Sequence, residues 1–152
     1  VYCVATVQEE GGVRGAITST YGIVPDVGIA IDVGHGDMLG VPEYETLPLG
    51  KGPAIGMGPH VHPALYSRLK EIADDLDIDV QVEPSPHPGG TDAFAIQITR
   101  GGIPTALISI PLRYMHTAVE TVSLSDIKKA GRLLAEFIVR LDKKFVEGLR
   151  CF

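Results

Sequence analysis

Two adjacent carboxylates, Glu9 and Glu10, follow an apolar run at the beginning of the chain. Neighbouring carboxylates at the end of a buried strand repel each other and are costly to desolvate, so a cation should compensate them. A divalent metal ion could take one carboxylate as a ligand and leave the other as the general base for a metal-bound water. The alternative for this pair is an acidic turn exposed to solvent.

Two further residues that could bind a metal follow other apolar runs. Asp32 lies near the end of the run at residues 28–33, and His116 follows the run at residues 103–110. Carboxylate and imidazole groups are ligands of Zn²⁺ and related divalent ions. His35 and Asp37 are close to Asp32 in the sequence and could be hydrogen-bond partners of the ligands. Taken singly, Asp32 is also explained as a helix cap or a loop hydrogen bond, and His116 as a solvated loop histidine.

The glycine-rich stretch at residues 89–93 leads into a predicted helix. It could present amide N–H groups to an anion or place Asp92 near a site, and Thr91 or Asp92 could cap the helix. No dinucleotide fingerprint, Walker loop, G-x-S-x-G elbow or C-x-x-C motif is present. The remaining histidines lie at the start of another helix or between prolines, so we interpret them as structural: His60, His62 and His87.

The apolar runs and the helical periodicity predict the elements that would position these residues. Helices are predicted over residues 13–21, 62–76 and 92–99, and a last helix begins at a cap formed by Ser123 or Ser125. Residues 34–52 and 84–90 are predicted to be loops. Strands are predicted over residues 1–7, 26–33, 53–57, 79–83 and 103–110.

Strands that alternate with helices predict an α/β fold, with a mostly parallel sheet and helices on both faces. In such sheets the ligand site lies beyond the carboxyl ends of the strands. All four candidate residues lie at predicted strand ends: Glu9, Glu10, Asp32 and His116. We therefore expect the topology to bring these four side chains to one edge of the sheet.

The composition limits the class of protein. The 152 residues are 45% hydrophobic and 21% charged, which suits one globular domain. A formal net charge of −6 disfavours a nucleic-acid binder, and no apolar run reaches the ~18 residues of a membrane-spanning helix. Only two cysteines occur, Cys3 and Cys151, so we expect a reducing, cytoplasmic setting. Because the chain begins without Met at a run typical of a central strand, we expect further sequence upstream of Val1.

Several short motifs lie in order along almost the whole chain, and together they resemble the glutamyl or tetrahedral (TET) aminopeptidases. These are dinuclear metallo-exopeptidases, and some members were labelled endoglucanases. The motifs are Val4-Ala5-Thr6-Val7-Gln8-Glu9-Glu10, Arg14-Gly15-Ala16, Asp32 with His35 and Asp37, Leu49-Gly50-Lys51-Gly52-Pro53, Gly90-Thr91-Asp92-Ala93, and Ile108-Ser109-Ile110-Pro111 through Arg113-Tyr114-Met115-His116.

The resemblance implies a zinc-exopeptidase-like fold and a role for each candidate. Glu9 would be the general base that activates the bridging water, Glu10 would bind one metal and Asp32 the other. His116 would close one coordination sphere, while Thr91 and Asp92 resemble a loop near the site without a defined role. The family also needs an upstream His ligand, a bridging Asp and an inserted dimerisation domain. Residues 1–152 therefore look like the C-terminal part of the catalytic domain.

The function implied by the resemblance is a metal-dependent aminopeptidase that releases N-terminal residues from peptides. The complete enzyme would hold two divalent ions, Zn or Co, and would be a cytoplasmic homo-oligomer without nucleic-acid or membrane partners. Residues 1–152 alone would bind at most one ion and be inactive. The alternative is a non-catalytic fold or assembly module with vestigial metal ligands. Glycoside hydrolysis by paired carboxylates is disfavoured, because the chain has no Trp and only 6% aromatic residues for stacking on sugars.

Overall fold

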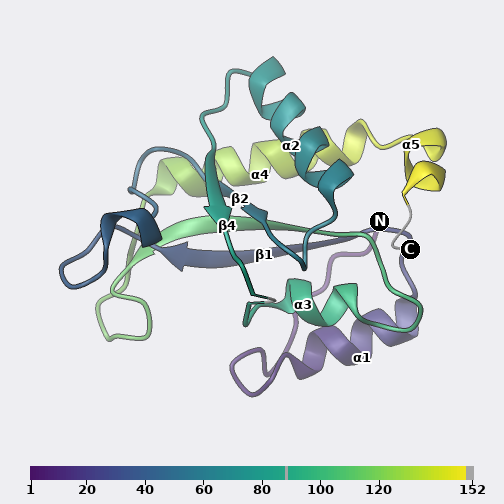
Figure 1. Ribbon diagram of the computed structural model, residues 1–152, viewed down its shortest axis with the longest axis horizontal. Helices are drawn as coiled ribbons and strands as arrows, with labels where there is room; N and C mark the ends of the chain where they lie inside the picture. Colours follow the sequence, from purple (N-terminus) through teal and green to yellow (C-terminus); the bar gives the residue numbers. More distant parts are fainter. Residues whose placement is uncertain (88, 150–152) are drawn as a thin grey trace.

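A computed structural model describes residues 1–87 and 89–149, which form one sheet with helices on both of its faces (Figure 1). The strand order is β1-β4-β2-β3, and β5 pairs with β4 outside this path. Parallel pairing joins β1 to β4 and β2 to β3, whereas β2 and β5 run antiparallel to β4. The predicted α/β fold with a mostly parallel sheet is confirmed. The strands are β1 Gly28–His35, β2 Ala54–Met57, β3 Gln81–Pro84, β4 Thr105–Arg113 and β5 Thr121–Val122.

The helices divide into two layers, one on each face of the sheet (Figure 1). Helices α1 and α3 pack against each other, and α3 covers β1 and β4; α2 and α4 pack together over β2 and β4 on the other face. None of the helices in the described ranges has the length and apolar character needed to cross a membrane. The helices are α1 Arg14–Ile23, α2 Pro63–Asp75, α3 Asp92–Gln97, α4 Leu124–Val139 and α5 Lys143–Gly148, with a 3₁₀ turn at Glu43–Glu45.

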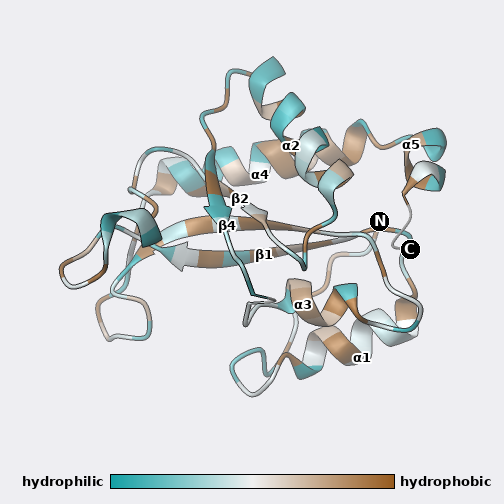
Figure 2. Cartoon of the chain, viewed as in Figure 1, coloured by the Kyte–Doolittle hydropathy of each residue, from teal (hydrophilic) through white to brown (hydrophobic). Residues whose placement is uncertain are grey.

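The larger part of the core lies between the sheet and the α2/α4 layer. Alternate residues of a strand point to opposite faces, so Ile108 of β4 faces α2 and α4 while its neighbour Leu107 faces α3. Leu133 and Phe137 of α4 are fully buried in the same cluster as Ile108, and burial of each such side chain contributes about 1.5–3 kcal/mol. Figure 2 shows the apolar residues along β1 and β4 and polar residues on the outer surfaces of the helices.

Most predicted elements are confirmed with shifts of up to a few residues at their ends, but the strand predicted over residues 1–7 is wrong. These residues form no strand in the structure, and Val1, Tyr2, Val4 and Val7 are exposed. A strand needs a hydrogen-bonding neighbour, and none of the described strands pairs with this segment. It is held instead by a hydrogen bond from the Gly15 amide to the Val7 carbonyl oxygen (2.9 Å).

Helices α2, α3 and α4 begin where the sequence predicts, but of these three only α2 has a side-chain hydrogen bond at its N-cap residue. His62 is the N-cap of α2, where its ring accepts a hydrogen bond from the Ala64 amide at 3.2 Å, in agreement with its structural interpretation. Thr91 and Ser123 occupy the N-cap positions of α3 and α4, yet neither side chain makes a capping hydrogen bond. These two helix ends are therefore fixed by the packing of their helices and not by their caps.

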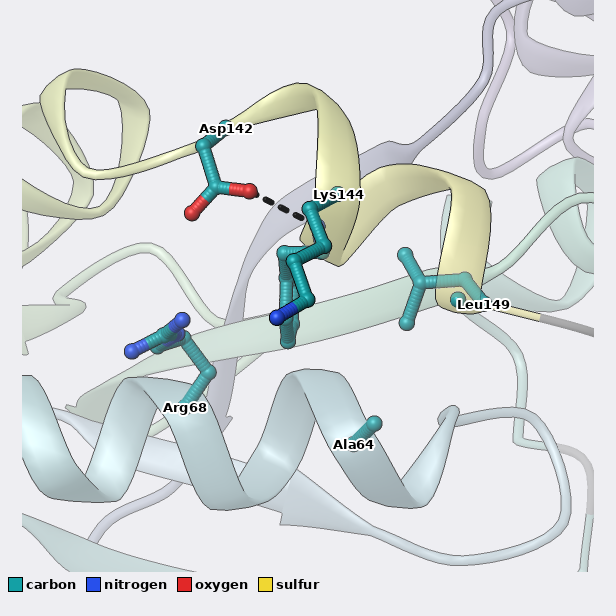
Figure 3. Close-up of a pocket in the computed structure, with 7 residues that line it drawn as sticks. Ala64, Arg68, Asp142, Lys144 and Leu149 are labelled. Atoms are coloured by element: carbon teal, nitrogen blue, oxygen red, sulfur yellow. Dashed lines mark hydrogen bonds between the residues drawn. The ribbon is translucent and has the colours of Figure 1, made fainter.

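Helix α5 was not predicted from the sequence. Its N-cap Asp142 accepts a hydrogen bond from the Phe145 amide at 2.8 Å, and Phe145 and Leu149 pack against the core. A hollow of about 460 Å³ lies between α5 and α2 (Figure 3), where the Arg68 guanidinium stands 4.7 Å from the centre of the Phe145 ring. Because this hollow lies on the α2/α4 side, it is separated by the sheet from helices α1 and α3.

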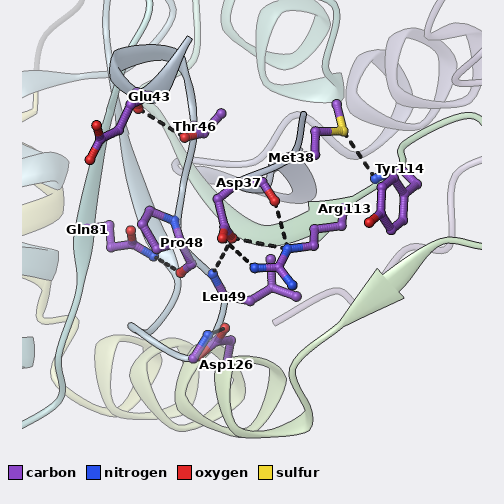
Figure 4. Close-up of polar contacts among 11 residues, drawn as sticks. Asp37, Met38, Glu43, Thr46, Pro48, Leu49, Gln81, Arg113, Tyr114 and Asp126 are labelled. Atoms are coloured by element: carbon purple, nitrogen blue, oxygen red, sulfur yellow. Dashed lines mark hydrogen bonds and ion pairs between the residues drawn. The ribbon is translucent and has the colours of Figure 1, made fainter. Parts of the chain in front are cut away.

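The predicted long loop after β1 is confirmed, and polar contacts fix both of its ends (Figure 4). At its beginning, Arg113 donates from Nε to the Asp37 carbonyl oxygen at 2.7 Å and forms an ion pair with the Asp37 carboxylate. At its end, the fully buried Asp126 of α4 accepts hydrogen bonds from the amides of Gly50 (2.7 Å) and Gly52 (2.9 Å). The loop is therefore tied to β4 and to α4.

We expect Asp126→Ala to destabilise the protein by about 2–3 kcal/mol, because two buried amide groups lose a charged acceptor. Thermal or urea unfolding measures the change. Asp74→Ala, at an exposed position of α2, is the matched control and should change stability by less than about 0.5 kcal/mol. A loss below about 1 kcal/mol for Asp126→Ala would contradict this role for the buried carboxylate.

Candidate functional site

The acidic pair lies in a tight turn immediately before α1. The amides of Gly12 and Val13 donate hydrogen bonds to the Glu9 carbonyl oxygen at 2.9 and 2.8 Å. Gln8 and Val13, which flank the turn, have the positive φ angles that non-glycine residues rarely adopt (58° and 50°). The backbone therefore holds Glu9 and Glu10 in a strained turn, a feature common at functional sites.

Four carboxylates from three parts of the chain act on one another here. Burial, followed by the charges of Asp32, Glu10 and Asp92, raises the pKa of Glu9. Burial also raises the pKa of Asp32, with further contributions from Asp92 and Glu10, against a hydrogen bond from the Val33 amide. The fold thus gathers the turn before α1, the strand β1 and the start of α3. The result is a concentration of negative charge.

His116 brings the only basic group that acts on Glu9 in this set. Its Nε2 lies 3.0 Å from Oε1 of Glu10, and both side chains are largely exposed (68% and 77%). The His116 amide also donates to Oε1 of Glu120 at 2.8 Å, and the backbone of His116 is left-handed with a φ of 61°. The loop after β4 therefore delivers this histidine to the acidic turn, although 106 residues separate it from Glu10.

Asp92 and Thr91 lie at the start of α3, beside the acidic turn. Oδ2 of Asp92 accepts a hydrogen bond from the Thr6 hydroxyl at 2.6 Å. The other oxygen, Oδ1, and the Thr91 hydroxyl are buried and have no hydrogen-bond partner among the described residues. Buried polar atoms without partners are costly, so these two atoms mark a position where a donor or a cation would be stabilising.

The two residues expected near Asp32 lie in different surroundings. Asp37 is engaged by Arg113 and by the Leu49 amide (3.2 Å), and Arg113 lowers its pKa. Its carboxylate therefore anchors the loop after β1, and its expected support of the ligands stays a prediction. His35 is exposed at the end of β1, and its charge lowers the pKa of Glu83.

Glu83 of β3 belongs to this region and had no predicted role. It accepts a hydrogen bond from the Ser109 hydroxyl, and the charge of Asp32 contributes to a raised pKa. The signal in the sequence was a carboxylate at the end of the predicted strand at residues 79–83, in which valines alternate with polar residues. Only the three-dimensional arrangement connects this carboxylate with Asp32, because 51 residues separate them in the sequence.

The donor set fits a divalent metal ion in its chemistry. Carboxylate oxygens and an imidazole nitrogen are ligands that Zn²⁺ accepts, and burial together with neighbouring carboxylates raises the pKa of Glu9 and of Asp32. Within the described ranges, however, no three His, Cys, Asp or Glu side chains are placed so that they could hold one ion. The residues present therefore fit part of a metal site. The side chains of Glu10 and His116 already contact each other there.

The sequence of this chain is similar to that of a known peptidase family. A profile of the family described as M42 glutamyl aminopeptidase matches residues 1–133. A lysyl aminopeptidase from Pyrococcus furiosus is 46% identical over 140 residues, which cover 90% of this chain and 40% of the relative.

Two solved structures with the same fold show the similarity in three dimensions. An aminopeptidase from Desulfurococcus kamchatkensis superposes with a TM-score of 0.88 at 39% identity, over 97% of this chain and 43% of that one. A TET peptidase from Pyrococcus horikoshii, which can assemble into a tetrahedron or a large octahedral shell, has a TM-score of 0.71 at 31% identity, over 88% of this chain and 38% of that one. The chain thus spans about 40% of the length of the relatives that it matches.

We expect Asp32→Asn to stabilise the metal-free protein at pH 7, by up to about 1 kcal/mol given the partial exposure of this group. Since the pKa of Asp32 is raised in the folded state, the cost of its charge is present above that pKa and absent below the unfolded value of about 3.9. Thermal unfolding with a chelator should therefore show a gain at pH 7 that disappears near pH 3. Asp74→Asn is the control, and a loss of stability at pH 7 would contradict the charge argument.

Proposed function

Because this chain belongs to the M42 glutamyl aminopeptidase family, we propose that the protein removes N-terminal residues from peptides in a metal-dependent hydrolysis. The observation that carries this proposal is the convergence of Glu9, Glu10, Asp32 and His116 on one acidic site from separate loops and a strand. A cluster of carboxylates with one imidazole suits a divalent cation, and peptidases of this family generally depend on divalent metals.

In this proposal Glu10, Asp32 and His116 supply ligands for two ions, Zn or Co. When bound, the ions would lower the pKa of a water and stabilise the negative charge that develops on the peptide carbonyl oxygen. The remaining ligands would come from the part of the relatives' length that this chain does not span. Residues 1–152 would then be the C-terminal part of the catalytic domain.

Glu9 is the residue of this chain that moves the proton. Glu9 is partly buried, and its raised pKa lies closer to neutral pH than that of a free carboxyl group. Such a pKa favours both the acceptance and the return of a proton. Glu9 accepts the proton of the attacking water and afterwards gives it to the amine of the departing peptide. The strained turn at Gln8 and Val13 fixes the position of Glu9 during both transfers.

Peptides are the proposed substrates, and the proposed assembly is a homo-oligomer. The TET peptidase from Pyrococcus horikoshii can assemble into closed shells, and its chain shares the fold of residues 1–152. The lysyl aminopeptidase from Pyrococcus furiosus supports an N-terminal residue as the group that is released.

Glu9→Gln in the complete gene product should lower kcat for an aminoacyl p-nitroanilide by about 10³-fold or more, because the amide cannot take the proton. Metal content measured by mass spectrometry should stay the same, since Glu9 is not a ligand in the proposal. Glu71→Gln, on α2 across the sheet, is the control and should retain activity. Wild-type activity in Glu9→Gln would remove Glu9 from the role of base.

Residues 1–152, prepared alone, should show no aminopeptidase turnover and bind at most one divalent ion per chain, because the proposed ligand set is incomplete. Far-UV circular dichroism checks that the sample is folded, and metal analysis after dialysis against Zn²⁺ or Co²⁺ measures the stoichiometry. Measurable turnover by the folded sample, or two tightly bound ions per chain, would contradict the proposal that further ligands are needed.

A further inference from the structure

Glu83, the third residue of β3, is a partly buried carboxylate that the proposed proton transfer does not use. Its Oε2 accepts a hydrogen bond from the hydroxyl of Ser109, a residue of β4 that is only 1% exposed. None of the ion pairs found among the described residues includes Glu83. This carboxylate is thus held in a defined place without a cationic partner.

The sheet places the Glu83 carboxylate beside Asp32. Ser109 is the residue of β4 that pairs with Asp32 of β1, so their side chains lie next to each other on the same face. Gly34, two residues after Asp32, points to that face as well, and a Cβ atom at Gly34 would lie only 2.7 Å from Oε1 of Glu83. The carboxylate therefore lies over Gly34 and is bonded to Ser109, the two positions that border Asp32.

The charge of Asp32 acts on the Glu83 carboxylate. Burial raises the pKa of Glu83, the Ser109 hydroxyl lowers it, and the charge of Asp32 raises it again. Among the basic groups of residues 1–87 and 89–149, His35 at the end of β1 acts on Glu83. A cation bound at Asp32 would relieve this repulsion, and the attraction between the cation and Glu83 would add to its binding.

We propose that Glu83 is a positioning carboxylate behind Asp32, which strengthens the binding of a divalent ion at Asp32 without being a ligand itself. Ser109 orients Glu83 for this role, and the missing side chain of Gly34 leaves room for its carboxylate. The inference rests on the proposed function, because it needs Asp32 to hold a metal.

The test compares metal affinity among variants of the complete gene product, measured by competition between the protein and a chelator for Co²⁺. Glu83→Gln keeps the shape and loses the charge, whereas Glu83→Asp keeps the charge and shortens the side chain. We expect Glu83→Gln to weaken Co²⁺ binding about tenfold, as is typical for partners of metal ligands, and Glu83→Asp to stay within about threefold of the wild type. Glu71→Gln, which removes an exposed charge from α2, is the matched control and should leave the affinity unchanged.

The order of the two variants separates charge from packing. Weaker binding by Glu83→Asp than by Glu83→Gln would mean that Glu83 only fills space, and equal affinity of Glu83→Gln and the wild type would mean that its charge is irrelevant; either result overturns the inference. If the wild type binds Co²⁺ and is active in these cases, the proposed function stands without this addition. A wild type that binds no divalent ion would overturn the proposed function and the inference together.

A second variant keeps the inference testable if Glu83→Gln does not fold. Gly34→Ala keeps the charge of Glu83 but displaces its carboxylate, since the new methyl group would lie 2.7 Å from Oε1 of Glu83 and 2.6 Å from Cδ1 of Leu47. We expect this variant to weaken Co²⁺ binding severalfold, whereas Gly131→Ala, at a position of α4 with no atom within 4 Å, should not. Unchanged affinity in a folded Gly34→Ala variant would overturn the inference.

Discussion

Mutual repulsion among carboxylates is the constraint on which this end of the molecule depends. The charges of neighbouring carboxylates help to raise the pKa of Glu9 and of Asp32, and among the described residues His116 is the basic group that acts on Glu9. Such an arrangement is unfavourable by itself, since Glu9 and Asp32 are partly buried beside other charges of the same sign. The rest of the fold must therefore supply the free energy that holds these groups together until a cation compensates them.

That free energy comes from the opposite face of the sheet. The apolar cluster between β4, α2 and α4 fixes the strands, with Ile108, Leu133 and Phe137 fully buried. Polar anchors then fix the loops: Asp126 holds the end of the long loop after β1, and Arg113 holds its beginning. Stability and chemistry are thus separated, because the strained turn at Gln8 and Val13 and the unpartnered Oδ1 of Asp92 lie on the side of α1 and α3.

The sequence was sufficient for the elements with strong periodicity and for the α/β class of the fold. Helix α2, for example, follows from the spacing of Leu65, Leu69 and Ile72, all of which are buried. The segment at residues 1–7 could not be predicted correctly, because a run of apolar β-branched residues says nothing about whether a pairing strand is available. Glu83 could not be placed beside Asp32 for a related reason: sequence spacing carries no information on contacts between strands distant in the chain. The catalytic and metal-binding roles of Glu9, Glu10, Asp32 and His116 remain predictions.

The central claim is that these carboxylates and one imidazole bind divalent ions. Anomalous diffraction from crystals of the complete gene product, grown with Zn²⁺ and measured at the zinc absorption edge, tests it most directly. We predict two peaks, with oxygen atoms of Glu10 and Asp32 and a ring nitrogen of His116 at about 2.0–2.2 Å from an ion. Peaks located elsewhere, or Glu10 and Asp32 too far apart to share one dinuclear centre, would contradict the account.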